Sequence, residues 1–187
     1  DFMFVQHMVA SLNNAGRMAV VMPHGVLYRG GEEKKFREWL VGRGYLEAVI
    51  GMPSALFYGT GIPACILVFK KNRNRDDVLF IDASGKDENG KPRYKKDKNQ
   101  NKLETKHIED IVSAYKNRVD IKKFAHVAGV DEIKANGYNL NIPRYVDTFE
   151  EEALVDIEEV KNNIANIQKE LDEVEKQMAG YLKELGL

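Results

Sequence analysis

Two aromatic residues beside glycines form the pattern in this sequence that most clearly indicates a possible ligand contact. Phe57 and Tyr58 lie in a predicted loop, residues 51–63, that also contains Gly59 and Gly61. Glycine permits close approach of the backbone to a ligand, and an aromatic face can stack on a nucleobase. The loop therefore predicts a ligand contact. The alternative is that both rings cap the hydrophobic core, and composition alone favours neither interpretation.

A second candidate is His24, which follows the apolar run 18–22 and Pro23. A polar residue just after a strand of an α/β sheet stands where such sheets bind ligands, so a ligand contact is one interpretation. The other is a turn histidine that hydrogen-bonds nearby backbone. The remaining histidines, His7, His107 and His126, have no partner in the sequence, and no ligand role is predicted for them.

The sequence shows no catalytic or metal-binding constellation, so no catalytic residue and no metal site are predicted in this chain. It has no glycine-rich phosphate loop, no nucleophile elbow and no paired-histidine motif. The single cysteine, Cys65, excludes an internal disulfide and lies in an apolar run typical of a buried strand. We expect a cytoplasmic protein, because the sequence has neither a signal peptide nor the roughly 20 apolar residues that span a bilayer.

The elements that would position these residues are those of an α/β sheet. The run 18–22 is short and apolar throughout, which predicts a central parallel strand covered on both faces. Residues 32–41 have an amphipathic helical pattern and 46–50 predict the next strand, so the three elements would form a crossover unit. Further elements are expected at residues 2–12 (helix), 64–69 (strand) and 78–82 (strand).

The middle of the chain is polar and basic. Residues 85–103 predict a mobile basic loop. The stretch from Lys86 to Lys106 contains eight basic residues and four acidic ones. Such a loop could contact a phosphate backbone or be a solvated insertion. Residues 104–148 predict a helix at 104–117 followed by an irregular segment at 124–145, which is either a short hairpin or an extended arm that returns to the body.

A heptad repeat characterises residues 149–187. Apolar residues recur at alternating spacings of three and four, which is typical of a coiled-coil seam. This segment carries a net charge of −7, whereas residues 1–148 carry +6, so the overall −1 averages two unlike parts. Because a narrow seam requires a partner helix, we predict a coiled-coil helix for subunit assembly. The seam consists of Ile157, Val160, Ile164, Ile167, Leu171, Val174, Met178, Tyr181 and Leu185.

Four sequence blocks, in order, resemble the modification (M) subunit of type I restriction-modification systems. They are GRMAVVMPHGVLYRGG at 16–31, AVIGMP at 48–53, LFYGTGIP at 56–63 and GYNLNIPRY at 137–145. The resemblance implies that residues 1–84 are the C-terminal part of a class I S-adenosylmethionine-dependent methyltransferase sheet, an α/β Rossmann-like fold. The long coiled-coil helix would follow it.

The same resemblance implies an adenine-specific DNA methyltransferase. Such enzymes transfer a methyl group from S-adenosylmethionine to the exocyclic amine of an adenine flipped out of the duplex. The family's catalytic Asn-Pro-Pro-aromatic motif and its glycine-rich cofactor motif are absent from this sequence, which begins at Asp1 without an initiator Met. We therefore expect a fragment, inactive alone, whose catalytic residues and most of whose cofactor site precede Asp1.

Few residue roles can be inferred from the resemblance. Phe57 and Tyr58 match the family's Phe-Tyr on the target-base side, and Phe57 is the candidate for contacting the flipped adenine. His24 matches a loop at the rim of the same cleft. For the block 137–145, which contains Asn141, Arg144 and Tyr145, a structural role is expected.

The partners implied by the resemblance are DNA, a second modification subunit, a specificity subunit and a restriction subunit, with no membrane. The seam would pack on the long helices of the specificity subunit, which also reads the DNA sequence. The alternative function is a noncatalytic α/β scaffold module whose role is coiled-coil assembly.

Overall fold

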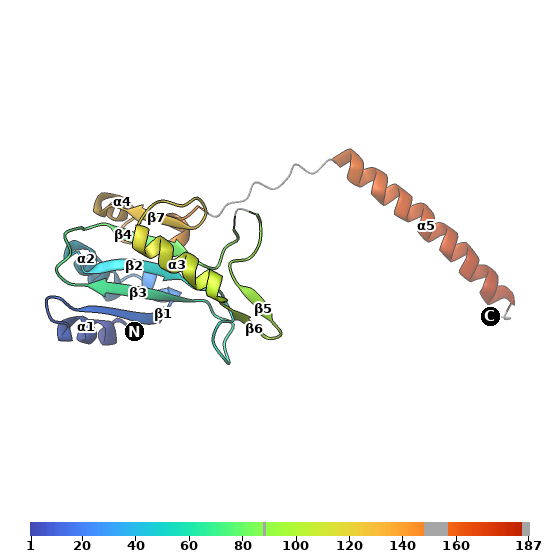
Figure 1. Cartoon of the computed structure of the whole chain (residues 1–187). Coiled ribbons are helices and arrows are strands. Elements are labelled where there is room, and N and C mark those ends of the chain that lie inside the picture. Colours follow the sequence, from blue (N-terminus) through green and yellow to red (C-terminus); the bar gives the residue numbers. More distant parts are fainter. Residues whose placement is uncertain (88, 148–156, 185–187) are drawn as a thin grey trace. The chain divides into compact units, whose positions relative to one another are not determined.

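A five-stranded mixed sheet forms the centre of the first of two units, Asp1–Phe149 and Glu150–Leu187 (Figure 1). The computed structural model describes residues 1–87, 89–147 and 157–184. The strands of the sheet are, in spatial order, β1 (Arg17–Pro23), β3 (Ala64–Lys70), β2 (Leu46–Gly51), β4 (Val78–Asp82) and β7 (Ala125–Ala128).

The prediction of a central parallel strand at residues 18–22 is wrong. Among the described residues β1 is an edge strand, and it pairs antiparallel with β3. Met18, Val20 and Met22 are more covered than the residues between them, and the side chain of Val21 is 50% exposed. An apolar run does not reveal its neighbours, because strand order depends on pairing with residues far away in the sequence. The other predicted strands are present: β2 and β4 pair in parallel, whereas β3 lies between β1 and β2 and is antiparallel to both.

Helices cover both faces of the sheet, and this explains why every residue of β2 is buried (Figure 1). One hydrophobic cluster joins the sheet to α1 (Phe2–Ser11), α2 (Glu32–Gly42) and α4 (Val130–Ala135). The other cluster joins the opposite face to α3 (Thr105–Asn117) through Ala114. A sheet covered in this way requires near-continuous apolar strands, as β2 and β4 have.

Residues 124–145 form neither of the two predicted structures, a short hairpin or an extended arm. They form β7, α4 and the short 3-10 helix η2 (Ile142–Arg144), and they belong to the core. The Tyr145 ring stacks on Phe80 with centroids 3.8 Å apart. A Cβ at Gly51, the last residue of β2, would lie 2.5 Å from Cδ1 of Ile142, so a larger residue there would require the Ile142 side chain to move. These elements are too short to show a periodic pattern in the sequence.

The segment predicted as a mobile basic loop contains ordered structure. A hairpin forms from β5 (Lys95–Asp97) and β6 (Gln100–Lys102), joined by the two-residue turn Lys98-Asn99. Its strands are polar, so the hydrophobic alternation that predicts a hairpin is missing.

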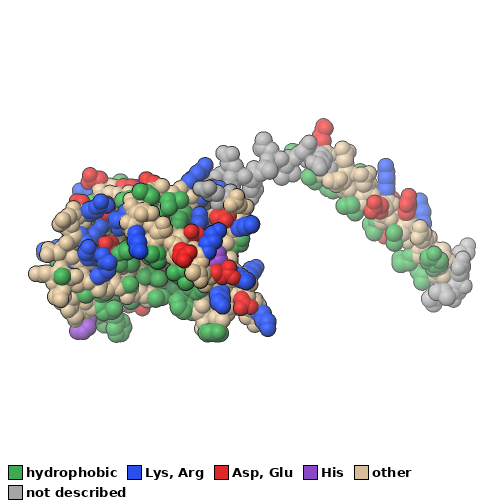
Figure 2. Space-filling view, viewed as in Figure 1, with side chains coloured by type: hydrophobic (Ala, Val, Ile, Leu, Met, Phe, Trp, Pro, Cys, Tyr) green, Lys and Arg blue, Asp and Glu red, His purple; other side chains and the backbone are tan. Residues whose placement is uncertain are grey.

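The second unit contains α5 (Ile157–Glu184), a helix of 28 residues. Of the predicted segment, residues 149–156 and the seam residue Leu185 lie outside the described residues. Every side chain of α5 that the structure describes is exposed, and apolar side chains follow one side of the helix (Figure 2). Among the described residues, no helix is long and apolar enough to cross a membrane.

Candidate functional site

The loop between β2 and β3 presents both predicted aromatic residues to solvent. The side chain of Phe57 is 42% exposed and that of Tyr58 is 91% exposed, whereas Leu56 packs against the α3-side cluster. A residue that caps the core would be largely buried, so the exposure of Tyr58 argues against that interpretation for its ring. The backbone turns at Ala55 and Gly59, which both have positive φ, and this turn carries the two rings outward.

The β5–β6 hairpin closes one side of a groove in front of Phe57 and Tyr58. The groove has a volume of about 630 Å³, with the 55–61 segment on one wall and the hairpin turn, Asp97–Gln100, on the other. Asn101 attaches the hairpin to the loop. Its backbone N–H donates to the Ala55 carbonyl at 2.8 Å, and its side-chain Nδ2 donates to the Ser54 carbonyl at 2.7 Å. The groove is therefore built from segments about 40 residues apart, which sequence inspection does not bring together.

His24 lies at the same edge of the sheet as the Phe57 loop. It begins the 3-10 helix η1 (His24–Leu27), and its Nε2 is 3.0 Å from the Ala64 carbonyl oxygen, which also accepts a bond from the Met52 N–H. A carbonyl only accepts, so Nε2 is the donor in this hydrogen bond. This hydrogen bond is the one expected of a turn histidine. A ligand contact by His24 stays a prediction.

Of the other three histidines, His107 and His126 contact neighbouring residues in structural roles. His107 Nδ1 accepts from the Glu104 N–H at 3.1 Å and completes the capping box of α3. His126 lies between Asp120 and Glu132, at 3.3 Å and 3.1 Å. His7 is exposed on α1. Among the described residues, no group of His, Cys, Asp and Glu has a geometry that could hold a metal ion.

Cys65 is a buried residue of β3, and its Sγ lies 3.4 Å from the Met22 carbonyl oxygen. Burial raises the pKa of its thiol to about 12. Because the thiolate is the nucleophilic form, this residue is unreactive at neutral pH. The structure agrees with the interpretation of Cys65 as a small buried hydrophobe.

Charged residues form an ion-pair network at the opposite edge of the sheet, where β2 and β4 begin. Asp77 Oδ1 accepts from Arg118 at 2.6 Å and from Arg73 at 3.1 Å, and Glu47 accepts from the Tyr115 hydroxyl at 2.7 Å. Each carboxylate in this network is occupied by a structural partner. The network fixes α3 on the sheet and presents no reactive group.

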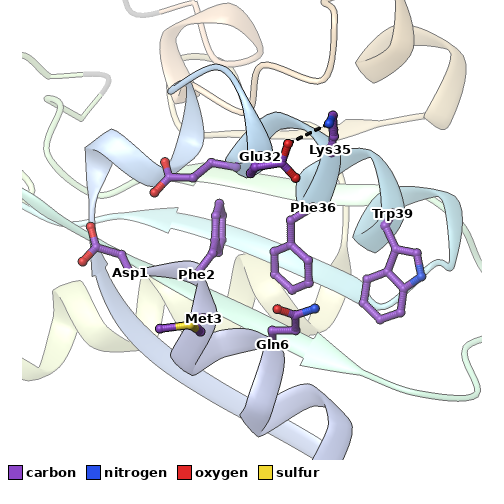
Figure 3. Close-up of a pocket in the computed structure, with 9 residues that line it drawn as sticks. Asp1, Phe2, Met3, Gln6, Glu32, Lys35, Phe36 and Trp39 are labelled. Carbon is purple, nitrogen blue, oxygen red and sulfur yellow. Dashed lines mark hydrogen bonds and ion pairs between the residues drawn. The ribbon is translucent and has the colours of Figure 1, made fainter.

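A second pocket, of about 500 Å³, lies between α1 and α2 (Figure 3). Three of its nine lining residues are aromatic: Phe36 stacks on Trp39 with centroids 5.6 Å apart, and Phe2 meets Phe36 edge-on at 5.1 Å. The Lys35–Glu32 ion pair lies at its rim, with Lys35 Nζ 2.6 Å from Glu32 Oε1. This arrangement packs two helices together and contains none of the predicted site residues.

A family model described as N-6 DNA Methylase matches residues 1–154, which is most of the chain. This match includes the sheet, the groove and the hairpin, and it ends before α5 begins at Ile157.

Individual relatives extend the match. The chain is 36% identical to the type I restriction enzyme MjaVIII methylase subunit of Methanocaldococcus jannaschii over 90% of this chain and 29% of that protein. It is 35% identical to the MpnII methylase subunit of Mycoplasma pneumoniae over 91% of this chain and 31% of that protein. The crystal structure of a type I restriction-modification methyltransferase subunit from Streptococcus thermophilus has 49% identity and a TM-score of 0.73, over 79% of this chain and 30% of that one. The chain thus spans about 30% of the length of the relatives it matches.

Proposed function

Because the chain belongs to the N-6 DNA methylase family, we propose that it is part of the DNA methyltransferase subunit of a type I restriction-modification system. The proposed reaction moves a methyl group from S-adenosylmethionine to the exocyclic amine of adenine in DNA. The family description supports the position of transfer, since N6 is that amine. The names of the relatives support the type I system.

The observation that carries this proposal for the present residues is the exposed aromatic pair at the groove. A methyltransferase cannot reach the amine of a stacked adenine, so it must flip the base out and hold it between apolar and aromatic side chains. We expect Phe57, which lines a groove of about 630 Å³ beside the sheet edge, to stack on such a base, and its partial exposure supports this role. Tyr58, almost fully exposed, would contact the neighbouring DNA.

S-adenosylmethionine would supply the methyl group, but the residues of this chain that the structure describes do not make a site for it. The sequence has no glycine-rich turn of the kind that binds this cofactor. The buried carboxylate at the end of β4, Asp82, already accepts bonds from the Ser84 N–H at 2.9 Å and hydroxyl at 2.5 Å. We therefore assign the catalytic and cofactor motifs to a part of the protein beyond these residues, and no cofactor-binding step to this chain.

We further propose that the subunit acts in an assembly in the cytoplasm with a second modification subunit, a specificity subunit and a restriction subunit. The word subunit in the names of the relatives supports association with other chains. The exposed apolar side of α5 supports a helical partner. The same helix also favours the alternative function, a noncatalytic scaffold for coiled-coil assembly, because a scaffold requires an assembly helix and no catalytic residues.

An activity measurement separates the two functions. The complete subunit that contains this sequence, assembled with its specificity subunit, is expected to transfer radiolabelled methyl groups to N6 of adenine in unmethylated genomic DNA. Residues 1–187 alone are expected to transfer none and to bind S-adenosylmethionine weaker than micromolar. Absence of methyl transfer by the complete assembly would favour the scaffold function. Methyl transfer or tight S-adenosylmethionine binding by residues 1–187 alone would contradict the assignment of the catalytic and cofactor motifs to other residues of the protein.

Replacing Phe57 by Ala in the complete enzyme should lower kcat/KM for methylation by about 10- to 100-fold, because stacking on one base contributes about 1–3 kcal/mol. The free energy of unfolding should change by less than about 1 kcal/mol, since the ring is partly exposed. Ile62→Ala is the matched control, an exposed apolar side chain of the same loop that does not line the groove. Parallel losses of rate and stability in Phe57→Ala would favour a core role for this ring.

A further inference from the structure

The β5–β6 hairpin has an unusual density of exposed positive charge for a structure of eight residues. Lys95, Lys96, Lys98 and Lys102 are all exposed, and Asp97 is the single acidic residue from 95 to 102. Lys and Arg side chains, with a few acidic ones between them, occupy the end of the first unit that carries β5 and β6 (Figure 2). Lys95 forms an ion pair with Glu104 at 2.9 Å, while Lys96, Lys98 and Lys102 have no ion pair with another described residue.

The register of the hairpin brings like charges together. Lys95 and Lys102 are directly opposite each other on the two strands. Like charges at such positions are destabilising unless an anion lies between or over them. The hydrogen bond from Lys95 lowers the pKa of the Glu104 carboxyl, and nearby His107 and Lys102 act in the same direction. The single carboxylate of Glu104 does not balance both lysines, so the hairpin retains a positive field at this end of the unit.

The hairpin is also fixed in place. The two Asn101 hydrogen bonds hold β6 against the loop that carries Phe57, although the residues around Asn101 in the hairpin are polar and mostly exposed. At the turn, Lys98 has a φ of 43°, in the left-handed region that a long side chain adopts at a cost. Glycine would adopt this φ at a lower cost, but the turn has a lysine here, at the rim of the groove.

We propose that the β5–β6 hairpin binds the DNA phosphate backbone next to the flipped adenine, with Lys96, Lys98 and Lys102 as the phosphate contacts. This rests on the proposed function, because it takes the groove between the hairpin and Phe57 as the target-base site. Cations that flank a flipped base hold the backbone in the distorted path that extrusion requires. Asn101 is a positioning residue, since it couples the phosphate-binding hairpin to the base-binding loop.

The test is the salt dependence of DNA binding by the complete subunit in its assembly. Each phosphate contact contributes about 0.9 to the slope of log K against log salt. The triple variant Lys96→Ala, Lys98→Gly and Lys102→Ala is therefore expected to lower the slope by about 2–3 and to weaken binding to a mixed-sequence duplex about 10-fold or more at low salt. Lys98→Gly suits the left-handed turn, so the hairpin should remain folded.

The matched control removes the same charge elsewhere on the unit. Lys116, in the last turn of α3, Lys122, in the turn that follows, and Lys134 on α4 are exposed lysines away from the groove. Replacing these three by Ala is expected to change the slope by less than about 1. An equal fall in both triple variants, or an unchanged slope in the hairpin variant, would overturn the proposal.

Two further outcomes separate this proposal from the function on which it rests. Methylation by the unaltered assembly together with an unchanged salt slope in the hairpin variant would refute the hairpin proposal alone. Absence of methylation by the unaltered assembly would refute the proposed function. A hairpin variant that binds DNA normally but fails to assemble with the specificity subunit would assign the hairpin to a protein partner and overturn the DNA proposal.

Discussion

Replacing Ile164 and Leu171 by Asp in the complete subunit is expected to abolish its assembly with the specificity subunit at micromolar concentrations. Both side chains lie on the apolar side of α5 and are exposed in this chain, at 56% and 52%. Burying one such side chain stabilises an interface by about 1.5–3 kcal/mol, and two lost contacts alone weaken association by more than about 100-fold. A buried unpaired carboxylate adds a further penalty, because it must lose its hydration without gaining a partner.

The control for this prediction adds the same charge to the opposite side of α5. Asn162 and Asn166 are exposed and lie off the heptad seam, so Asn162→Asp with Asn166→Asp should leave assembly within about 3-fold of the unaltered subunit. Size-exclusion chromatography of the mixed subunits measures the outcome. Residues 1–149 should melt at the same temperature in all three proteins. Assembly that persists in the Ile164→Asp and Leu171→Asp double variant would show that the seam is not the interface.

Elements with a strong local pattern were predictable from the sequence, and their arrangement was not. The helices at Glu32–Gly42 and Thr105–Asn117 and the strands at Leu46–Gly51 and Val78–Asp82 lie within about two residues of the predicted ranges, because periodicity and apolar runs are local properties. The position of β1 depends on β3, which begins more than 40 residues later. No window around residues 18–22 contains that information, so an edge strand was mistaken for a central one.

The candidate site was predictable on one side only. Two aromatics beside glycines marked the Phe57 loop as a possible ligand contact, but composition alone did not distinguish that role from capping of the core. The opposite wall is the polar β5–β6 hairpin, and its attachment depends on one asparagine among many polar residues. Arg37 was missed for a related reason. A charged residue on an amphipathic helix is normally expected to be exposed to solvent, but the Arg37 side chain is buried.

Arg37→Met is expected to lower the free energy of unfolding by about 3–5 kcal/mol, because it leaves buried carbonyl groups unsatisfied. The side chain is only 1% exposed, and it donates to three carbonyl oxygens in two separate segments. The acceptors are Val26 at 2.9 Å, Arg29 at 2.7 Å and Tyr138 at 2.9 Å. Burial lowers the pKa of the guanidinium, and Glu33 and Glu38 act in the opposite direction. Methionine fills the space of the stem but donates no hydrogen bond.

Urea denaturation of residues 1–187 measures this loss, and thermal melting should show a fall of about 6–15 °C. Arg43→Met, at an exposed arginine that ends the same helix, should change stability by less than about 0.5 kcal/mol. Arg37→Lys should recover little, since one ammonium cannot reproduce the fork that reaches three carbonyls. A loss below about 1 kcal/mol would show that water replaces the guanidinium. Because two of the carbonyls belong to η1 and the turn after it, this arginine fixes the segment that begins with His24 and holds it at the edge of the sheet that carries the groove.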